Sequence, residues 1–164
     1  MLPLSIAIVL TVLDQLTKVI VCRSFLLYEA VPVIPGLFNL RYIQNTGAAW
    51  GMFAGGHYWL SGLSLVVLAG LVMFQRHFFN RTLLDQCAFG IMMGGIIGNL
   101  IDRVRLSYVV DFLDFHWNDA HFPAFNVADA AICSGVALYM LSQGLQARRQ
   151  RRISAAAASG GPAS

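Results

Sequence analysis

The chain has 164 residues, of which 57% are hydrophobic and only 12% are charged, and its mean hydropathy is +0.65. Soluble domains average about 25% charged residues, so this composition excludes an ordinary soluble domain and predicts an integral membrane protein. Much of the net charge of +3 comes from RRQRR at 148–152, which indicates a cytoplasmic flank beside a membrane rather than a nucleic-acid-binding surface.

Four apolar segments have the length of membrane-crossing helices, at residues 2–22, 58–75, 84–101 and 127–147. A hydrocarbon core of about 30 Å needs roughly 20 helical residues. We therefore expect an all-α membrane protein with four transmembrane helices, forming a single domain over residues 1–150. A cleavable signal peptide is the alternative for the first segment, but no basic residue precedes it. Residues 151–164 lack an apolar pattern and are predicted to form a disordered cytoplasmic tail.

The basic residues predict the orientation of these spans. With four spans, Arg76, Arg81 and the run at 148–152 fall on the same side of the membrane. The positive-inside rule makes that side cytoplasmic, so both termini are expected in the cytoplasm. The longer loops, 23–57 and 102–126, then face outward.

Both outer loops contain alternating patterns that predict short strands. LFNLRYIQN at 37–45 alternates apolar and polar residues, and RVRLSYVVDF at 103–112 does so again. The segment 36–56 is rich in glycine and carries aromatic residues that suit the membrane interface. We expect a small extracytoplasmic β-rich element and an interfacial segment whose anchors are Trp50, Phe53, Tyr58 and Trp59.

Glycines mark one face of the third apolar segment. Gly90, Gly94 and Gly98 are spaced four apart, which places them near one side of a helix. Small residues at this spacing let another helix approach closely. The third helix is therefore predicted to be central in the bundle.

Two aspartates have unusual positions where the second outer loop meets apolar chain. Asp111 ends an extended segment, and Asp129 would lie in the first turn of the fourth helix, after Asn126 as its N-cap. Two carboxylates held close together share one proton, so they offer an acid and a base that can activate water. Helix capping, ion pairing with Arg103 or Arg105, and cation conduction remain open as alternatives.

The other ionisable residues are given supporting or structural roles. Asp14 and Lys18 interrupt the first span at positions i and i+4, so they share a helix face and can pair, although the lysine can also extend toward the interface. This pair is either structural or part of a site. Asp114 and Asp119 are predicted to lie in a polar loop. No HExxH motif occurs, so no metal site is expected.

Five separated blocks carry a family resemblance. They are DQLTK at 14–18, NTGAAW at 45–50, GNLIDR at 98–103, VVDF at 109–112 and FPAFNVAD at 122–129. In this order, between four spans, they resemble the lipoprotein signal peptidase family, signal peptidase II. The match covers about residues 10–145, and five blocks together are far more specific than any one of them.

The resemblance implies a bacterial inner-membrane aspartyl endopeptidase that works near the outer face. Such an enzyme removes the signal peptide from diacylglyceryl-modified prolipoproteins, cutting before the lipidated cysteine. It implies that Asp111 and Asp129 are the catalytic pair. Nine further positions are implied to shape or support the site: Asp14, Lys18, Asn45, Gly47, Asn99, Asp102, Arg103, Asn126 and Ala128.

The expected partners are lipid-modified substrates and membrane lipid, with no cofactor, no metal and no nucleic acid, and the protein is expected to be a monomer. One alternative is a small ion-coupled transporter with carboxylates inside the membrane. Such a carrier predicts ionisable groups at several depths and an internal repeat, whereas the acids crowd one interface and no repeat is found. A purely structural assembly factor would leave the five polar blocks unexplained.

Overall fold

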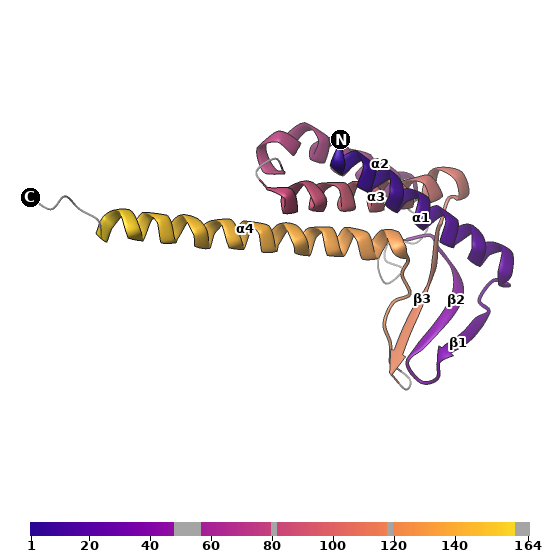
Figure 1. The fold of residues 1–164 in the computed structure, drawn as a ribbon. Coiled ribbons are helices and arrows are strands. Elements are labelled where there is room, and N and C mark those ends of the chain that lie inside the picture. The colour runs from indigo at the N-terminus through magenta and orange to yellow at the C-terminus, as the bar shows by residue number, and fades with distance from the viewer. Residues whose placement is uncertain (48–56, 80–81, 118–119, 160–164) are drawn as a thin grey trace, which may run out of the picture.

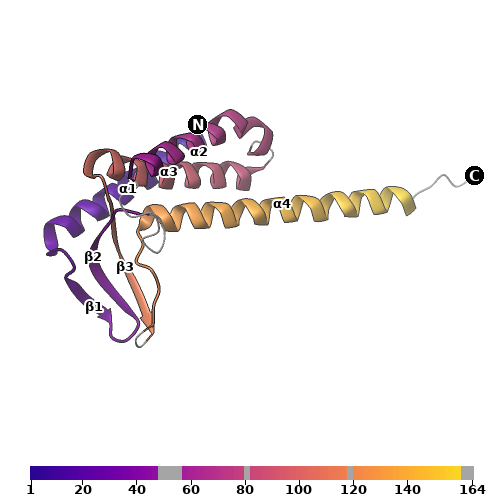
Figure 2. The same cartoon turned by 180° about the vertical axis from the view of Figure 1, so that it is seen from behind.

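The computed structural model describes the chain except for residues 48–56, 80–81, 118–119 and 160–164. Its helices are α1 (Leu2–Ser24), α2 (His57–Phe78), α3 (Leu83–Leu106) and α4 (Val127–Ser159). Its strands are β1 (Ala30–Ile34), β2 (Phe38–Asn45), β3 (Val109–Trp117) and β4 (Ala120–His121). The helices lie side by side, and the sheet extends from the end of the bundle at which α4 begins (Figures 1 and 2).

Three helices in the described part of the chain are long and apolar enough to cross a membrane, namely those at Leu2–Ser24, Tyr58–Phe78 and Leu83–Leu106. They contain the first three predicted spans. The predicted span at 127–147 is helical within α4, but polar residues such as Asp129 and Gln143 interrupt its apolar sequence. Helix α4 is not among the three candidates, so a fourth transmembrane span stays a prediction.

Helix α3 is longer than the sequence predicts. The alternation at 103–112 predicts a strand from residue 103, but the helix continues to Leu106, and β3 begins only at Val109. No glycine or proline interrupts the chain between Asp102 and Leu106, and basic side chains in the last turn favour the negative end of the helix dipole. The helix ends at Ser107, whose φ of 67° is left-handed. Asp102 therefore lies in a helix rather than in the outer loop.

The C-terminal tail also differs from the prediction. Helix α4 continues to Ser159 and extends past the other helices (Figure 1). Residues 151–159 are therefore helical rather than disordered. Arginine, glutamine and alanine are good helix formers, and no proline or glycine lies between Gly144 and Ser159. The rest of the predicted tail, 160–164, lies outside the described residues.

The β-rich element is an antiparallel sheet with strand order β1-β2-β3-β4. The predicted strand at 37–45 is confirmed as β2. One face of the sheet packs against the end of α1 in a cluster of buried side chains: Val21, Tyr42, Val110 and Phe112. This packing joins the sheet to the bundle, so residues on β3 are held at a defined position relative to the helices.

The part of the predicted interfacial segment at 48–56 lies outside the described residues, and so do Trp50 and Phe53. The part of it at 38–45 belongs to β2. Tyr58 and Trp59 lie in the first turn of α2, where their side chains are exposed, which suits the interfacial anchoring predicted for them.

Glycines bring α3 close to two neighbours, as the four-residue spacing predicts. A Cβ atom added at Gly94 would lie 2.9 Å from the Ala7 carbonyl oxygen of α1. On the same face of α3, a Cβ atom added at Gly90 or Gly98 would also lie too close to atoms of α1. On another face, Gly95 lies against the Ala128 carbonyl of α4. Helix α3 is therefore the central helix that α1 and α4 both contact.

A buried polar cluster joins α3 and α4 at the end of the bundle away from the sheet. Asp85 and Thr82 form a capping box, with the Asp85 amide donating to Thr82 Oγ1 at 3.1 Å and the Thr82 amide to Asp85 Oδ2 at 3.0 Å. Gln143 and Gln146 of α4 donate to the same carboxylate, and Ser142 bonds Thr82. The Asp85 carboxylate therefore caps α3 and holds α3 against α4.

We expect Gly95→Ala to lower the free energy of unfolding by about 1 to 3 kcal/mol, because the added methyl group must push α4 away from α3. Ile132 Cγ1 would lie only 2.8 Å from it. The matched control is Gly70→Ala on α2, where nothing lies within 4 Å of the added Cβ. That change should be neutral or stabilising by up to about 1 kcal/mol. Thermal unfolding in detergent measures both, and equal losses would contradict this packing.

Candidate active site

Asp111 lies in β3 with both carboxylate oxygens hydrogen-bonded and only 2% of its surface exposed. Asn45 Nδ2, from the end of β2, donates to Oδ2 at 2.8 Å. Asn126 Nδ2, from the residue before α4, donates to Oδ1 at 2.7 Å. Both bonds come from neutral amides, so among the described residues no bonded cation balances the charge of this buried carboxylate.

Asp129 lies in the first turn of α4 and caps the helix. The Asp129 amide donates to Asn126 Oδ1 at 2.9 Å, and the Asn126 amide donates to Asp129 Oδ2 at 3.3 Å. These reciprocal bonds confirm Asn126 as the N-cap. The other oxygen, Oδ1, accepts a 2.7 Å bond from Asn99 Nδ2 of α3. Capping therefore explains only one of the two carboxylate oxygens.

Asn126 connects the two carboxylates. Its side-chain amide donates to Asp111, while its side-chain carbonyl accepts from the amide of Asp129. It is completely buried. The structure thus brings together the two aspartates that the sequence predicts to meet. Neither of them forms an ion pair with Arg103 or Arg105 in the described part of the chain.

Burial raises the pKa of Asp111 from 3.8 to about 7, because the charged form loses its hydration. The negative charge of Asp129 raises this pKa further, whereas the amides of Asn45 and Asn126 and the charge of Lys18 lower it. Desolvation and like-charge repulsion therefore outweigh the hydrogen bonds. Near neutral pH the Asp111 carboxyl group binds a proton for much of the time.

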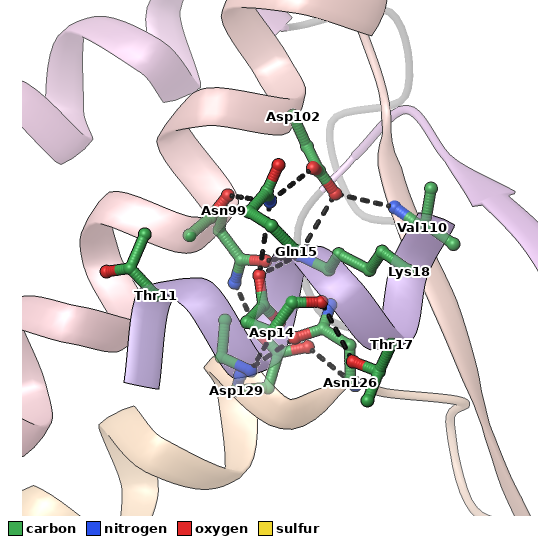
Figure 3. Close-up of polar contacts among 12 residues, drawn as sticks. Thr11, Asp14, Gln15, Thr17, Lys18, Asn99, Asp102, Val110, Asn126 and Asp129 are labelled. Carbon is green, nitrogen blue, oxygen red and sulfur yellow. Dashed lines mark hydrogen bonds and ion pairs between the residues drawn. The ribbon is translucent and has the colours of Figure 1, made fainter. Parts of the chain in front are cut away.

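A buried ion network, formed by Asp14, Lys18 and Asp102, lies next to the carboxylate pair. Lys18 Nζ lies 2.9 Å from Asp14 Oδ2 and 3.0 Å from Asp102 Oδ2, and it donates to Asn99 Oδ1 at 2.9 Å (Figure 3). Lys18 is only 2% exposed. The lysine therefore points into the protein, and the alternative in which it extends toward the interface is wrong.

The same network holds the backbone on which each aspartate of the pair lies. Asp14 Oδ1 accepts a 2.9 Å bond from the amide of Ala128, which directly precedes Asp129. Asp102 Oδ2 accepts a 3.1 Å bond from the amide of Val110, one residue before Asp111 (Figure 3). The ion network thus positions both members of the pair.

The remaining predicted residues also lie at the site. The Gly47 amide donates to Asn45 Oδ1 at 2.9 Å, which orients the Asn45 amide toward Asp111. Arg103 is half-buried on α3, and its positive charge acts on Asp102, Asp111 and Asp129.

Two residues of the site were missed from the sequence. Gln15 Nε2 donates to Asp102 Oδ1 at 2.9 Å and to the Gly98 carbonyl at 3.2 Å. Its position beside Asp14, as an amide within an apolar span, was the available signal. Asp114 is 3% exposed within β3 and accepts a bond from Asn39, so its predicted place in a polar loop is wrong.

A bulge in β3 explains why Asp114 faces the site. The amides of Phe112 and Leu113 both donate to the Phe125 carbonyl, at 3.0 and 2.9 Å, which interrupts the alternation of the strand. As a result Asp111 and Asp114 line the same cavity, about 390 Å³ in volume. Its walls come from β2, β3 and the segment before α4: Arg41, Ile43, Gln44, Asn45, Thr46, Asp111, Asp114, Phe122, Pro123 and Ala124.

The site can perform acid–base chemistry on a molecule in this cavity. One carboxylate of the pair lines the cavity, and the second is linked to it through Asn126. Within the described ranges, no three His, Cys, Asp or Glu side chains are grouped closely enough to hold a metal ion. The fold and site together define a helical membrane protein with a buried carboxylate pair at one end of its bundle.

Comparisons with known proteins identify the family. The family model described as "Signal peptidase (SPase) II" matches residues 6–144. The lipoprotein signal peptidase of Syntrophotalea carbinolica is 46% identical over 143 residues, covering 85% of this chain and 89% of that protein. That of Symbiobacterium thermophilum is 43% identical, covering 86% and 93%. The chain therefore belongs to the signal peptidase II family of peptidases.

Solved structures agree with this assignment. A bacterial membrane enzyme solved at 2.3 Å by the in meso method superposes with a TM-score of 0.79 at 33% identity, covering 86% of each chain. A second one, solved at 1.9 Å, gives 0.76 at 32% identity, covering 86% of this chain and 91% of that one. The fold is thus that of a bacterial membrane enzyme.

We expect Lys18→Met to lower the free energy of unfolding by about 3 to 5 kcal/mol, because it leaves Asp14 and Asp102 buried without their shared cation. Denaturant or thermal unfolding in detergent measures this loss. Arg23→Gln is the control, since Arg23 is exposed in the last turn of the same helix. It should change stability by no more than about 0.5 kcal/mol. A similar small effect of Lys18→Met would contradict a stabilising role of the ion network.

The raised pKa of Asp111 predicts a pH-dependent stability. Between 3.8 and about 7 the folded protein holds a proton that the unfolded chain has lost, so stability falls as pH rises through this range. Relative to Asp111→Asn, the wild type should lose up to about 1.4 kcal/mol of unfolding free energy per pH unit. Thermal unfolding of both proteins across this range is the measurement. Parallel curves for the two proteins would show that Asp111 titrates normally.

Proposed function

We propose that the protein removes the signal peptide from diacylglyceryl-modified prolipoproteins by cutting before the lipidated cysteine. Family membership supports the substrate class. The observation that carries the chemistry is the bridge made by Asn126 between Asp111 and Asp129 beside a cavity. A carboxylate pair in such a place is suited to aspartyl hydrolysis, in which water attacks the peptide carbonyl directly.

The surroundings of the two carboxylates assign them different roles in this proposal. Asp111, whose pKa is raised to about 7, carries the shared proton and donates it to the carbonyl oxygen. Burial disfavours the charged form of Asp129, but the bonds from Asn99 Nδ2 and the Asn126 amide and the positive charge of Arg103 act in its favour. Asp129 therefore acts as the base that takes a proton from water.

The reaction proceeds through a tetrahedral intermediate without a covalent bond to the enzyme. The water oxygen bonds the carbonyl carbon while Asp129 takes its proton, and Asp111 protonates the carbonyl oxygen. When the C–N bond breaks, the proton on Asp129 goes to the amine of the lipidated cysteine, and the intermediate's hydroxyl returns its proton to Asp111. Arg103, half-buried beside the pair, favours the negative charge that develops on the way.

The arrangement of the bundle supports a site near the outer face of the bacterial inner membrane. The carboxylate pair lies where α4 begins, whereas the arginines at 148–152 lie toward its far end (Figure 1). If α4 crosses the membrane as a fourth span, the positive-inside rule places both termini in the cytoplasm and the pair outside. The single domain works as a monomer in this proposal and receives its lipid-modified substrate sideways from the bilayer.

The transporter alternative is less well supported. A carrier needs ionisable groups at several depths of the membrane. Asp14, Asp102, Asp111 and Asp129 instead lie in one continuous network at one end of the bundle. The buried carboxylate at the other end, Asp85, is occupied in capping α3.

We expect Asp111→Asn and Asp129→Asn each to lower kcat by roughly 10²- to 10⁴-fold or more, because an amide can neither donate nor accept the transferred proton. The assay is cleavage of a diacylglyceryl-modified prolipoprotein peptide by purified protein in lipid. Glu29→Gln is the matched control, since it makes the same carboxyl-to-amide change at an exposed residue between α1 and β1.

Unfolding curves should show that both variants insert and fold. If either variant is folded and cuts at the wild-type rate, the assignment of the pair is wrong. A chelator should leave the activity unchanged, and a loss that zinc restores would favour a metallopeptidase instead.

A further inference from the structure

The cavity beside the carboxylate pair contains a cation that the proposed mechanism does not use. Arg41 of β2 lines it together with Asp111 and Asn45. The Arg41 side chain is half-buried, and its buried Nε has no hydrogen-bond partner among the described residues. A buried donor without a partner is unfavourable, so an acceptor brought into this cavity would bind well.

The alternation of side chains along β2 directs Arg41 into the cavity, as it does Ile43 and Asn45. The pairing of β2 with β3 changes register between Leu40 and Ile43, so that two residues, Arg41 and Tyr42, face a single residue of β3. Tyr42 packs into the core with 8% of its surface exposed, which leaves Arg41 for the opposite, cavity-lining face.

The position of the cavity indicates which part of a substrate it would hold. The apolar part of a signal peptide belongs in the bilayer, alongside the helices. The cavity is formed instead by β2, β3 and the segment before α4, at the end of the bundle where the sheet extends away (Figure 1). The chain that follows the lipidated cysteine is outside the membrane, so this is the segment that can lie against the sheet.

We infer that Arg41 is a positioning residue that binds the main chain of the mature segment, on the carboxyl-terminal side of the scissile bond. This inference rests on the proposed function. Asp111 and Asp114 line the same cavity and disfavour an acidic substrate side chain there. A main-chain carbonyl is neutral and is present in every substrate, and the guanidinium group can bond it with two donors.

Two substrates separate this role from a structural one. Both carry the same signal peptide and lipidated cysteine, but the long one continues through several mature residues and the short one ends in a carboxamide after the cysteine. Arg41→Gln should raise KM for the long substrate roughly ten-fold or more with kcat nearly unchanged, and leave KM for the short one unaltered. Arg41→Lys should give a smaller increase, because it keeps the charge but not the planar donor pair.

Controls make each outcome decisive. Arg23→Gln, which removes an exposed arginine of α1, should change neither KM. If the short substrate is cut too slowly to follow, its inhibition constant against the long one replaces KM. Equal effects of Arg41→Gln on both substrates, or none on either, would overturn the inference, as would wild-type KM values that do not distinguish the substrates. If the wild type cuts neither substrate, the proposed function itself is wrong. Loss of cutting in Asp111→Asn alone is consistent with the proposed function.

Discussion

The structure depends on one buried interaction, the contact of Lys18 with Asp14 and Asp102. These three charged groups are at most 3% exposed, so they have lost nearly all hydration and need close partners. The lysine lies within 3.0 Å of both carboxylates. Asp14 Oδ1 accepts the amide proton of Ala128, and Asp102 Oδ2, which also contacts the lysine, accepts that of Val110. Because each of these amides directly precedes an aspartate of the pair, the ion network joins α1 and α3 to the starts of α4 and β3. Close helix contacts at the glycines of α3 make these distances short enough.

The carboxylate pair has an asymmetry that follows from its two supporting elements. Asp129 lies in a helix N-terminus, where backbone amides and the helix dipole favour a negative charge. Asp111 lies in a strand and receives only neutral side-chain amides. Burial and the nearby charge of Asp129 raise the pKa of Asp111 to about 7. An acid and a base that differ in this way can work at the same pH, which is what hydrolysis by activated water requires.

The sheet contributes through one strand that departs from regular alternation and one that keeps it. A bulge in β3 brings Asp111 and Asp114 to one face, and the alternation of β2 leaves Arg41 facing the same cavity while Tyr42 packs into the core. Polar side chains from two strands thus converge beside the pair without exposing the apolar face that packs on α1. The bundle holds the pair in position, and in the proposed function the sheet supplies donors and acceptors for an extended peptide.

The sequence by itself determined the three most apolar helices, the strand at 38–45 and the two aspartates that the fold brings together, because these depend on local periodicity and on motif spacing. It did not predict that α3 continues through Asp102 or that residues 151–159 are helical. Alternating polarity and low hydropathy indicate which side chains are exposed, and they do not determine whether the backbone is helical. Only the tertiary structure decided how the site is joined. The bond from Ala128 to Asp14 links residues 114 positions apart, and no local pattern records such a contact. The two explanations of Asp129, capping and pairing, also proved compatible, because the carboxylate has two oxygens and the fold gives each a different partner.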